Sequence, residues 1–159
     1  MSDSNMIMPE NLVLTSGSFL KLLDTLVNHF GSAGESMIFQ MGRENGMVFC
    51  RETISKIDHS GDSLDALFNL VLEGASKIGW ANMVVEEFNP QTGNIKVVLK
   101  DNAFKQFCLR FNMPQCFFMR GYLSGIIKEL TNVDYIFSHS ECLAHGDEHC
   151  SIRLVAEGF

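Results

Sequence analysis

The first part of the chain has apolar residues at the spacing of amphipathic helices. Between Phe19 and Phe30 they recur three and four positions apart, which predicts one helix. Ser18 and Gly31 are residues that typically begin and end such a helix. A second helix is expected to follow directly, because Ser32–Glu35 has the form of a capping box.

Two glycines interrupt the polar and apolar pattern of this second helix. Gly42 and Gly46 each cost about 1 kcal/mol relative to alanine inside a helix. Their spacing of four places both on one helical face, and we interpret them as a site where another element packs very closely. A third helix is expected to begin after Asp62 or Ser63 and to end at Gly79.

The second part of the chain alternates between strand and helix patterns. Two hairpins and two helices are expected, in the order strand, strand, short helix, long helix, strand, strand. This order predicts an α+β fold, with a four-stranded antiparallel sheet of two hairpins and helices packed on one face. Residues 1–12 are expected to form a flexible leader and residues 13–159 a single small-molecule-binding domain. The expected strands cover 83–88, 95–99, 135–142 and 150–155, and the helices 104–111 and 114–132.

Charge and hydropathy narrow the classes of partner. The net charge is −7, the isoelectric point is about 5.1, and the sequence has no cluster of Lys and Arg. These properties argue against nucleic acid and against an anionic membrane surface. No apolar run approaches the roughly 18 residues of a spanning helix, and the start of the chain lacks the positive region of a signal peptide. We therefore expect a cytoplasmic protein.

Cysteine and histidine are concentrated near the C-terminal end. Three of the five histidines and two of the five cysteines lie within residues 139–150. Zinc prefers four nitrogen or sulfur ligands, and an odd number of cysteines in a cytoplasmic chain favours metal binding over a disulfide framework. We predict a zinc site formed by Cys116, which lies in the first turn of its predicted helix, together with Cys142 and Cys150. The fourth ligand is expected to be His139, with Glu141, His145 and His149 as alternatives.

A hydrophobic ligand is a second expectation. The chain contains 13 Phe and 9 Met but only one Trp and two Tyr, so much of its apolar volume carries no polar group. An apolar pocket between helices and sheet would suit a small hydrophobic molecule. No catalytic triad, phosphate-binding loop or dinucleotide fingerprint is found, so no catalytic residues are predicted. The candidate ligand-binding residues are Phe68, Leu72, Trp80, Phe107, Phe111, Phe118 and Tyr122.

Several of these motifs together resemble a known family. Gly121–Gly125, Glu141–Cys150, Gly79-Trp80 and a cysteine twenty-six positions before Cys142 are similar to the 4-vinyl reductase domain family, over about Leu64 to Val155. The resemblance implies a fold shared with haem-based nitric-oxide sensors and small subunits of vesicle-tethering particles. It also implies similarity to the aromatic-sensing domains of phenol- and xylene-responsive activators. Those domains hold zinc through three cysteines and an acidic residue, and His139 falls at the acidic position.

Three functions follow as hypotheses. The leading one is a metal-stabilised sensor or carrier domain for a small hydrophobic or aromatic molecule, expected to form a homodimer. The second is a reductase, or an accessory subunit, that acts on a tetrapyrrole vinyl group. The third is a dimeric interaction protein without a ligand, assembled through Gly42 and Gly46 or through Gly121 and Gly125. We expect a binding domain rather than an enzyme.

Overall fold

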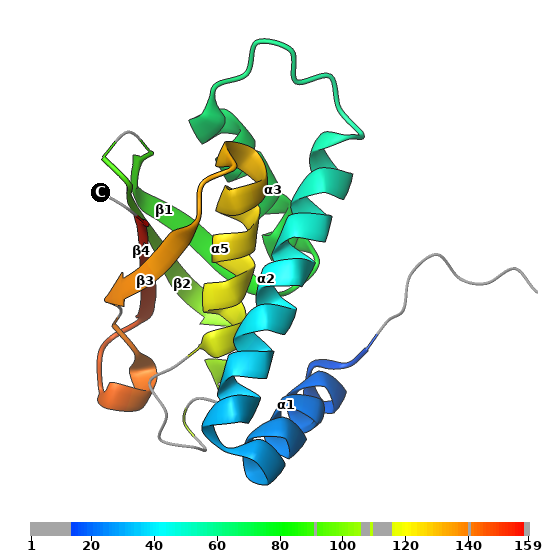
Figure 1. Ribbon diagram of the computed structural model, residues 1–159, viewed down its shortest axis with the longest axis vertical. Coiled ribbons are helices and arrows are strands. Elements are labelled where there is room, and N and C mark those ends of the chain that lie inside the picture. Colours follow the sequence, from blue (N-terminus) through cyan, green and yellow to red (C-terminus); the bar gives the residue numbers. More distant parts are fainter. Residues whose placement is uncertain (1–13, 91, 106–108, 110–115, 140, 158–159) are drawn as a thin grey trace, which may run out of the picture.

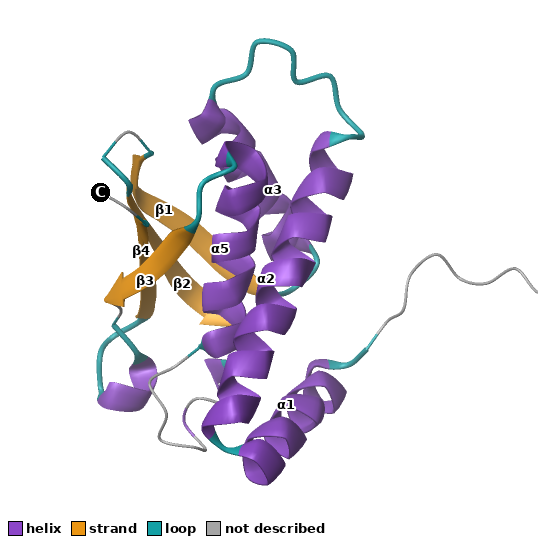
Figure 2. Cartoon of the chain, in the orientation of Figure 1, coloured by secondary structure: helices purple, strands orange, loops and turns teal. Residues whose placement is uncertain are grey.

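The computed structural model describes residues 14–90, 92–105, 109, 116–139 and 141–157. Within these ranges four long helices and four strands follow one another along the chain (Figures 1 and 2). None of these helices is both long enough and apolar enough to cross a membrane. The elements are α1 (Ser16–Phe30), α2 (Ser32–Ile54), α3 (Leu64–Lys77), β1 (Ala81–Asn89), β2 (Asn94–Asn102), α5 (Phe117–Thr131), β3 (Tyr135–His139), the short 3-10 helix η1 (Leu143–His145) and β4 (Cys150–Ala156).

The four strands form one antiparallel sheet in the order β1-β2-β4-β3. The two hairpins therefore lie side by side through β2 and β4, and helices cover one face of the sheet (Figure 1). This arrangement confirms the fold class predicted from the sequence. Alternate residues of the two central strands point into the core, as the period of two requires. The fully or almost fully buried ones are Ile95, Val97, Leu99, Ile152 and Leu154.

The central helix of the domain is α5, which lies between the sheet and α2 (Figure 1). Every residue from Phe118 to Ile127 is buried. A helix that is buried on all sides needs small residues wherever a neighbouring backbone approaches it. In α5 these residues are Gly121 and Gly125, and in α2 they are Gly42 and Gly46.

The four glycines bring the backbones of α2 and α5 into direct contact. A methyl group added at Gly42 would overlap the carbonyl oxygen of Phe118, and one at Gly46 would overlap that of Tyr122. From the other side, Gly121 and Gly125 meet the carbonyl oxygens of residues 39 and 43 of α2. The predicted close packing at Gly42 and Gly46 is confirmed. These faces bury one another within the chain, so the hypothesis that they join two chains is wrong.

The ends of the first two helices differ from the sequence prediction. Thr15, not Ser18, caps α1, and its hydroxyl oxygen accepts a hydrogen bond from the Ser18 backbone N–H at 3.2 Å. The expected capping box does not form at Ser32. Only Gly31, with φ of 53°, separates α1 from α2, so Ser32 is already helical and cannot act as a cap.

The later boundaries are closer to expectation. The hydroxyl of Ser63 caps α3 by accepting a hydrogen bond from the Ala66 backbone N–H at 3.2 Å, which decides between Asp62 and Ser63. The long helix α5 begins at Phe117 with Cys116 as its N-cap, so Cys116 precedes the first turn instead of lying in it. Pro114 and most of the expected short helix around Phe104–Phe111 lie outside the described residues.

The connection between the last two strands is longer than residues 143–149, the length expected from the sequence. β3 ends at His139, and a shift in the pairing register with β4 occurs between Phe137 and His139. The Asp147 carboxylate accepts a hydrogen bond from the Cys142 backbone N–H at 2.7 Å, and Gly146 adopts a φ of 91°. These contacts hold a compact loop in which Cys142 precedes η1 and Cys150 begins β4.

Candidate ligand cavity and cysteine cluster

Five aromatic side chains from separate parts of the chain pack around one point. Rings in contact have their centroids between 5.1 and 6.2 Å apart, in stacked, tilted and edge-to-face arrangements. Such geometries are favourable because the positive edge of one ring meets the negative face of another. The cluster joins α1, the turn before β1, the segment after β2 and α5. Its members are Phe19, Trp80, Phe104, Phe118 and Tyr122.

A cavity of about 630 Å³ opens beside this cluster. Its volume lies within the range of small-molecule sites, and its walls are mainly apolar. Asn45 of α2 supplies one of its few polar side chains. Phe19, Leu20, Trp80 and Phe104 form the larger apolar surfaces of its wall.

The predicted ligand-binding residues divide into three groups. Trp80 lines the cavity, and Phe118 and Tyr122 belong to the aromatic cluster beside it. Phe68 and Leu72 are buried in the core and do not line this cavity. Phe68 stacks instead on Phe88 of β1, with 5.0 Å between the ring centroids. Phe107 and Phe111 lie outside the described residues.

Phe19 and Phe104 line the cavity but were not among the ligand contacts predicted from the sequence. Both were placed on helical patterns, and nothing in those patterns shows which face meets a cavity. Phe19 lies 5.5 Å from Trp80 and 6.0 Å from Phe104, measured between ring centroids. The Gly79-Trp80 pair was the one local signal for the position of this cavity. Gly79 adopts a positive φ and forms a turn that places the Trp80 ring, which Phe19 and Phe104 then contact.

The Tyr122 hydroxyl is a buried polar group without a hydrogen-bond partner among the described residues. Burial raises the pKa of Tyr122 well above its usual range, and the nearby Cys50 thiol adds to this effect. Burial also raises the pKa of Cys50 to about 12, with Glu129 contributing in the same direction. Both groups therefore stay neutral at physiological pH.

Replacing Tyr122 with Phe is expected to stabilise the ligand-free domain by about 1 kcal/mol, because an unsatisfied buried hydroxyl costs free energy. Urea denaturation of Tyr122→Phe measures this change. Tyr135→Phe is the matched control, since the Tyr135 hydroxyl is not among the buried unsatisfied groups, and we expect little change there. A clear loss of stability in Tyr122→Phe would show that the hydroxyl does have a partner.

The three predicted metal-binding cysteines are buried at one end of the sheet. Cys116 is the N-cap of α5, Cys142 precedes η1 and Cys150 begins β4. A hydrogen bond with the Cys116 side chain lowers the pKa of the Cys150 thiol. Burial opposes this shift, the Leu143 backbone N–H assists it, and the neighbouring Cys142 raises the pKa again. No disulfide joins Cys50, Cys116, Cys142 and Cys150.

The alternatives for a fourth ligand have different surroundings. The carboxylate of Glu141 accepts a hydrogen bond from the Ser151 hydroxyl at 2.6 Å, and this bond together with the Lys96 charge holds its pKa below the usual range. His149 Nε2 lies 3.2 Å from Glu141 Oε2 but forms no hydrogen bond with any described residue. His145 is exposed on η1, and the backbone of His139 pairs with Arg153.

The described side chains do not by themselves form a complete metal site. Within the described part of the chain, which leaves out the side chain of His139, no three or more His, Cys, Asp or Glu side chains are grouped to hold a metal ion. Cys116 and Cys142 nevertheless both interact with Cys150. Cys116 and Cys142 therefore lie close to Cys150, and the thiol chemistry of these residues suits zinc.

The sheet order and the helices on one face define an α+β domain. Residues 95–156 match the model of the 4-vinyl reductase domain, which confirms the family resemblance found in the sequence. An uncharacterized protein of Methanocaldococcus jannaschii is 34% identical over 86 residues. That match covers 49% of this chain and 36% of the other protein, so the chain spans only part of that relative.

Solved structures of low sequence identity share the fold. The phenol-responsive sensory domain of the transcription activator PoxR, in complex with phenol, has a TM-score of 0.79 at 18% identity; the match covers 94% of this chain and 78% of that one. A trafficking protein particle complex subunit 3 from Naegleria fowleri, covalently bound to palmitic acid, has a TM-score of 0.67 at 15% identity, covering 91% and 93%. An H-NOX protein from Shewanella oneidensis has a TM-score of 0.63 at 10% identity, covering 98% and 83%. The predicted likeness to haem-based sensors and vesicle-tethering subunits is thereby confirmed for the fold.

Proposed function

We propose that this protein is a metal-stabilised sensor or carrier domain for a small hydrophobic or aromatic molecule. The observation that carries the proposal is the cavity of about 630 Å³ beside the five-ring cluster. An aromatic ligand would gain edge-to-face and stacked contacts with Phe19, Trp80 and Phe104 in addition to the burial of its apolar surface.

The ligands of the structural relatives support the same class of molecule. The PoxR sensory domain was solved with phenol, and the trafficking subunit was solved with covalently bound palmitic acid. Both molecules present an apolar body with a single polar end. In this chain the rings of Phe19, Trp80 and Phe104 form part of the cavity wall, which favours an aromatic ligand.

The proposed metal is zinc, held by Cys116, Cys142, Cys150 and a fourth ligand for which His139 is the leading choice. Bound there, zinc would act as a structural ion that ties the final strands to the start of α5. The convergence of Cys116 and Cys142 on Cys150 supports this assignment. The homodimer and the cytoplasmic location expected from the sequence remain predictions.

Ligand binding is directly observable, because Trp80 is the only tryptophan in the chain and forms part of the cavity wall. We expect phenol, or toluene as a nonpolar analogue, to change the Trp80 fluorescence in a saturable way. Phe104→Ala is expected to weaken binding by about tenfold, since it removes a ring contact of about 0.5–1.5 kcal/mol together with the burial of apolar surface. Isothermal titration calorimetry provides the matching affinities.

Phe88→Leu provides the control for this experiment. Phe88 is a partly buried phenylalanine of β1 that stacks on Phe68 and does not line the cavity. Its replacement is expected to leave the affinity unchanged. If neither compound binds the folded protein, or if both variants bind as the wild type does, the assignment of this cavity as the ligand site is wrong.

A further inference from the structure

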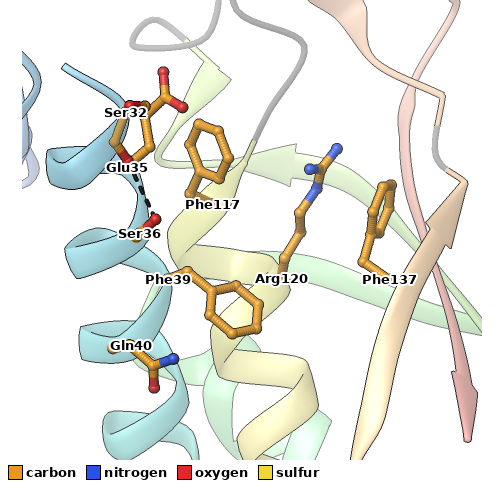
Figure 3. Close-up of a pocket in the computed structure, with 8 residues that line it drawn as sticks. All are labelled: Ser32, Glu35, Ser36, Phe39, Gln40, Phe117, Arg120 and Phe137. Carbon is orange, nitrogen blue, oxygen red and sulfur yellow. Dashed lines mark hydrogen bonds between the residues drawn. The ribbon is translucent and has the colours of Figure 1, made fainter. Parts of the chain in front are cut away.

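The wall of the aromatic cavity contains no ionisable side chain among the described residues that line it. A second pocket, with a volume of about 360 Å³, shows that this is not a general property of the molecule. It lies between α2, α5 and β3, and its wall includes both Glu35 and Arg120 (Figure 3). The aromatic cavity differs from it because its described wall offers only uncharged groups to a ligand.

The backbone that borders the cavity next to the sheet already uses its hydrogen-bond donors. The N–H groups of Ile78, Gly79 and Trp80 donate to carbonyl oxygens of α3 at distances of 3.1 to 3.3 Å. The N–H of Ala103 donates to the Trp80 carbonyl oxygen at 3.1 Å. This side of the cavity therefore presents rings and aliphatic surface to a ligand, and these four N–H groups are not available to it.

Asn45 supplies an uncharged polar group on the opposite side of the cavity, from α2. It is adjacent to Gly46, whose backbone lies against the Tyr122 carbonyl, so the amide is held near the ring cluster. Within the described part of the chain, the Asn45 side chain forms no hydrogen bond. A primary amide has two N–H donors and a carbonyl acceptor, so it can bind one hydroxyl or carbonyl group of a ligand.

These features favour a neutral ligand over an ion. An ion that enters the cavity loses part of its hydration and meets no counter-ion in the described wall, which costs more free energy than burial of a neutral polar group. A neutral ring keeps the aromatic contacts with Phe19, Trp80 and Phe104. When a ring covers Asn45, the amide loses water, and a ligand without a hydrogen-bonding group leaves the amide unsatisfied.

From this combination we propose that the cavity selects uncharged aromatic molecules with one hydrogen-bonding group, and that Asn45 is the residue that recognises this group. The inference rests on the proposed function, because it concerns the ligand of the same cavity. The rings of the wall bind the aromatic body, and the Asn45 amide sets which polar end is accepted. Asn45 is thus a specificity-determining residue, and ionised aromatic acids and amines are excluded.

Four compounds that share one benzene ring test the selection against charge. They are phenol, toluene, benzoate and benzylammonium, with affinities measured by calorimetry on the full chain. We expect both ions to bind about a hundredfold more weakly than phenol, or more weakly still. Both signs are needed, because the net charge of −7 alone would repel benzoate but attract benzylammonium. An ion that binds as tightly as phenol would overturn the selection for uncharged ligands.

Two substitutions of Asn45 test its role. Asn45→Leu removes the amide, and we expect the ratio of phenol affinity to toluene affinity to fall by about fivefold, since a neutral hydrogen bond contributes about 1 kcal/mol. Asn45→Asp supplies the missing counter-ion, and we expect it to strengthen benzylammonium binding by about tenfold. This second change is a gain of binding, so a loss of stability cannot imitate it. The Asn45 side chain is exposed in the ligand-free domain, so both variants should fold.

Gln40→Leu is the matched control, because Gln40 is an exposed amide of the same helix that lines the second pocket instead. Its affinity ratio should equal that of the wild type. If Asn45→Leu leaves the ratio unchanged, or if Ser16→Ala lowers it instead, the role of Asn45 is refuted while the proposed function stands, since phenol and toluene still bind. If none of the four compounds binds, the proposed function fails and the inference fails with it.

Discussion

Gly46→Ala is expected to lower the free energy of unfolding by more than about 4 kcal/mol, or to prevent folding. The added methyl group would overlap the carbonyl oxygen of Tyr122, which belongs to a buried helix and has no room to move. Removing this overlap would require α2 and α5 to move apart along their whole contact, and this would leave gaps in the packed core. Urea denaturation of the purified variant measures the loss, and the yield of soluble protein gives a first indication.

Gly74→Ala is the control for this prediction. Gly74 also lies within a helix, α3, but a methyl group there would meet only side-chain atoms, the Phe49 ring at 3.4 Å and the Thr53 methyl group at 4.0 Å. We expect a change of about 1 kcal/mol or less, with the better helix propensity of alanine offsetting the contact. If Gly46→Ala proves as mild as Gly74→Ala, the backbone contact between α2 and α5 is contradicted.

Cys142→Ser is expected to lose zinc and, with it, much of the stability of the domain. Native protein purified without a chelator should contain about one zinc ion per chain. At a free zinc concentration about a thousand times the dissociation constant, binding stabilises the fold by about 4 kcal/mol. For a domain of this size the melting temperature of the variant should then fall by roughly 10 °C. Elemental analysis and thermal melting measure the two effects.

Cys50→Ala separates the loss of metal from the loss of a buried thiol. Cys50 is completely buried beside Tyr122 and has no role in the cysteine cluster. This variant should keep its zinc even if its melting temperature falls. A native protein without metal, or a Cys142→Ser protein with full metal content and unchanged melting, would refute the structural zinc site.

The sequence predicted the elements well because their patterns are local. Periodicity predicted the four long helices, the two hairpins and the α+β class, and the spacing of Gly42 and Gly46 indicated a close contact. It did not indicate that the partner is α5, because that contact joins residues far apart in the chain. The same limit applies to Phe19 and Phe104, which meet only when α1 and the end of β2 come together.

The starts of the helices show a second limit. Ser18 and Ser32 both carry good capping side chains, yet Thr15 and Gly31 occupy the capping positions. A capping residue is effective only where the backbone before it leaves the helix, and the short connection between α1 and α2 decides that point. The burial of Arg120, which is 8% exposed and lies over the rings of Phe117 and Phe137, was missed for a related reason. A lone arginine in a helical pattern looks exposed until the phenyl rings that cover it are placed.

The parallel contact between α2 and α5 also affects how the domain could change shape when a ligand binds. Gly42 lies against Phe118 and Gly46 against Tyr122, so the two helices are locked in register by main-chain atoms. Main-chain contacts have no alternative rotamers that could absorb a displacement. The pair should therefore shift as one rigid body when a ligand moves the first turn of α5. The two helices should therefore move together over the whole length of their contact, instead of sliding past one another.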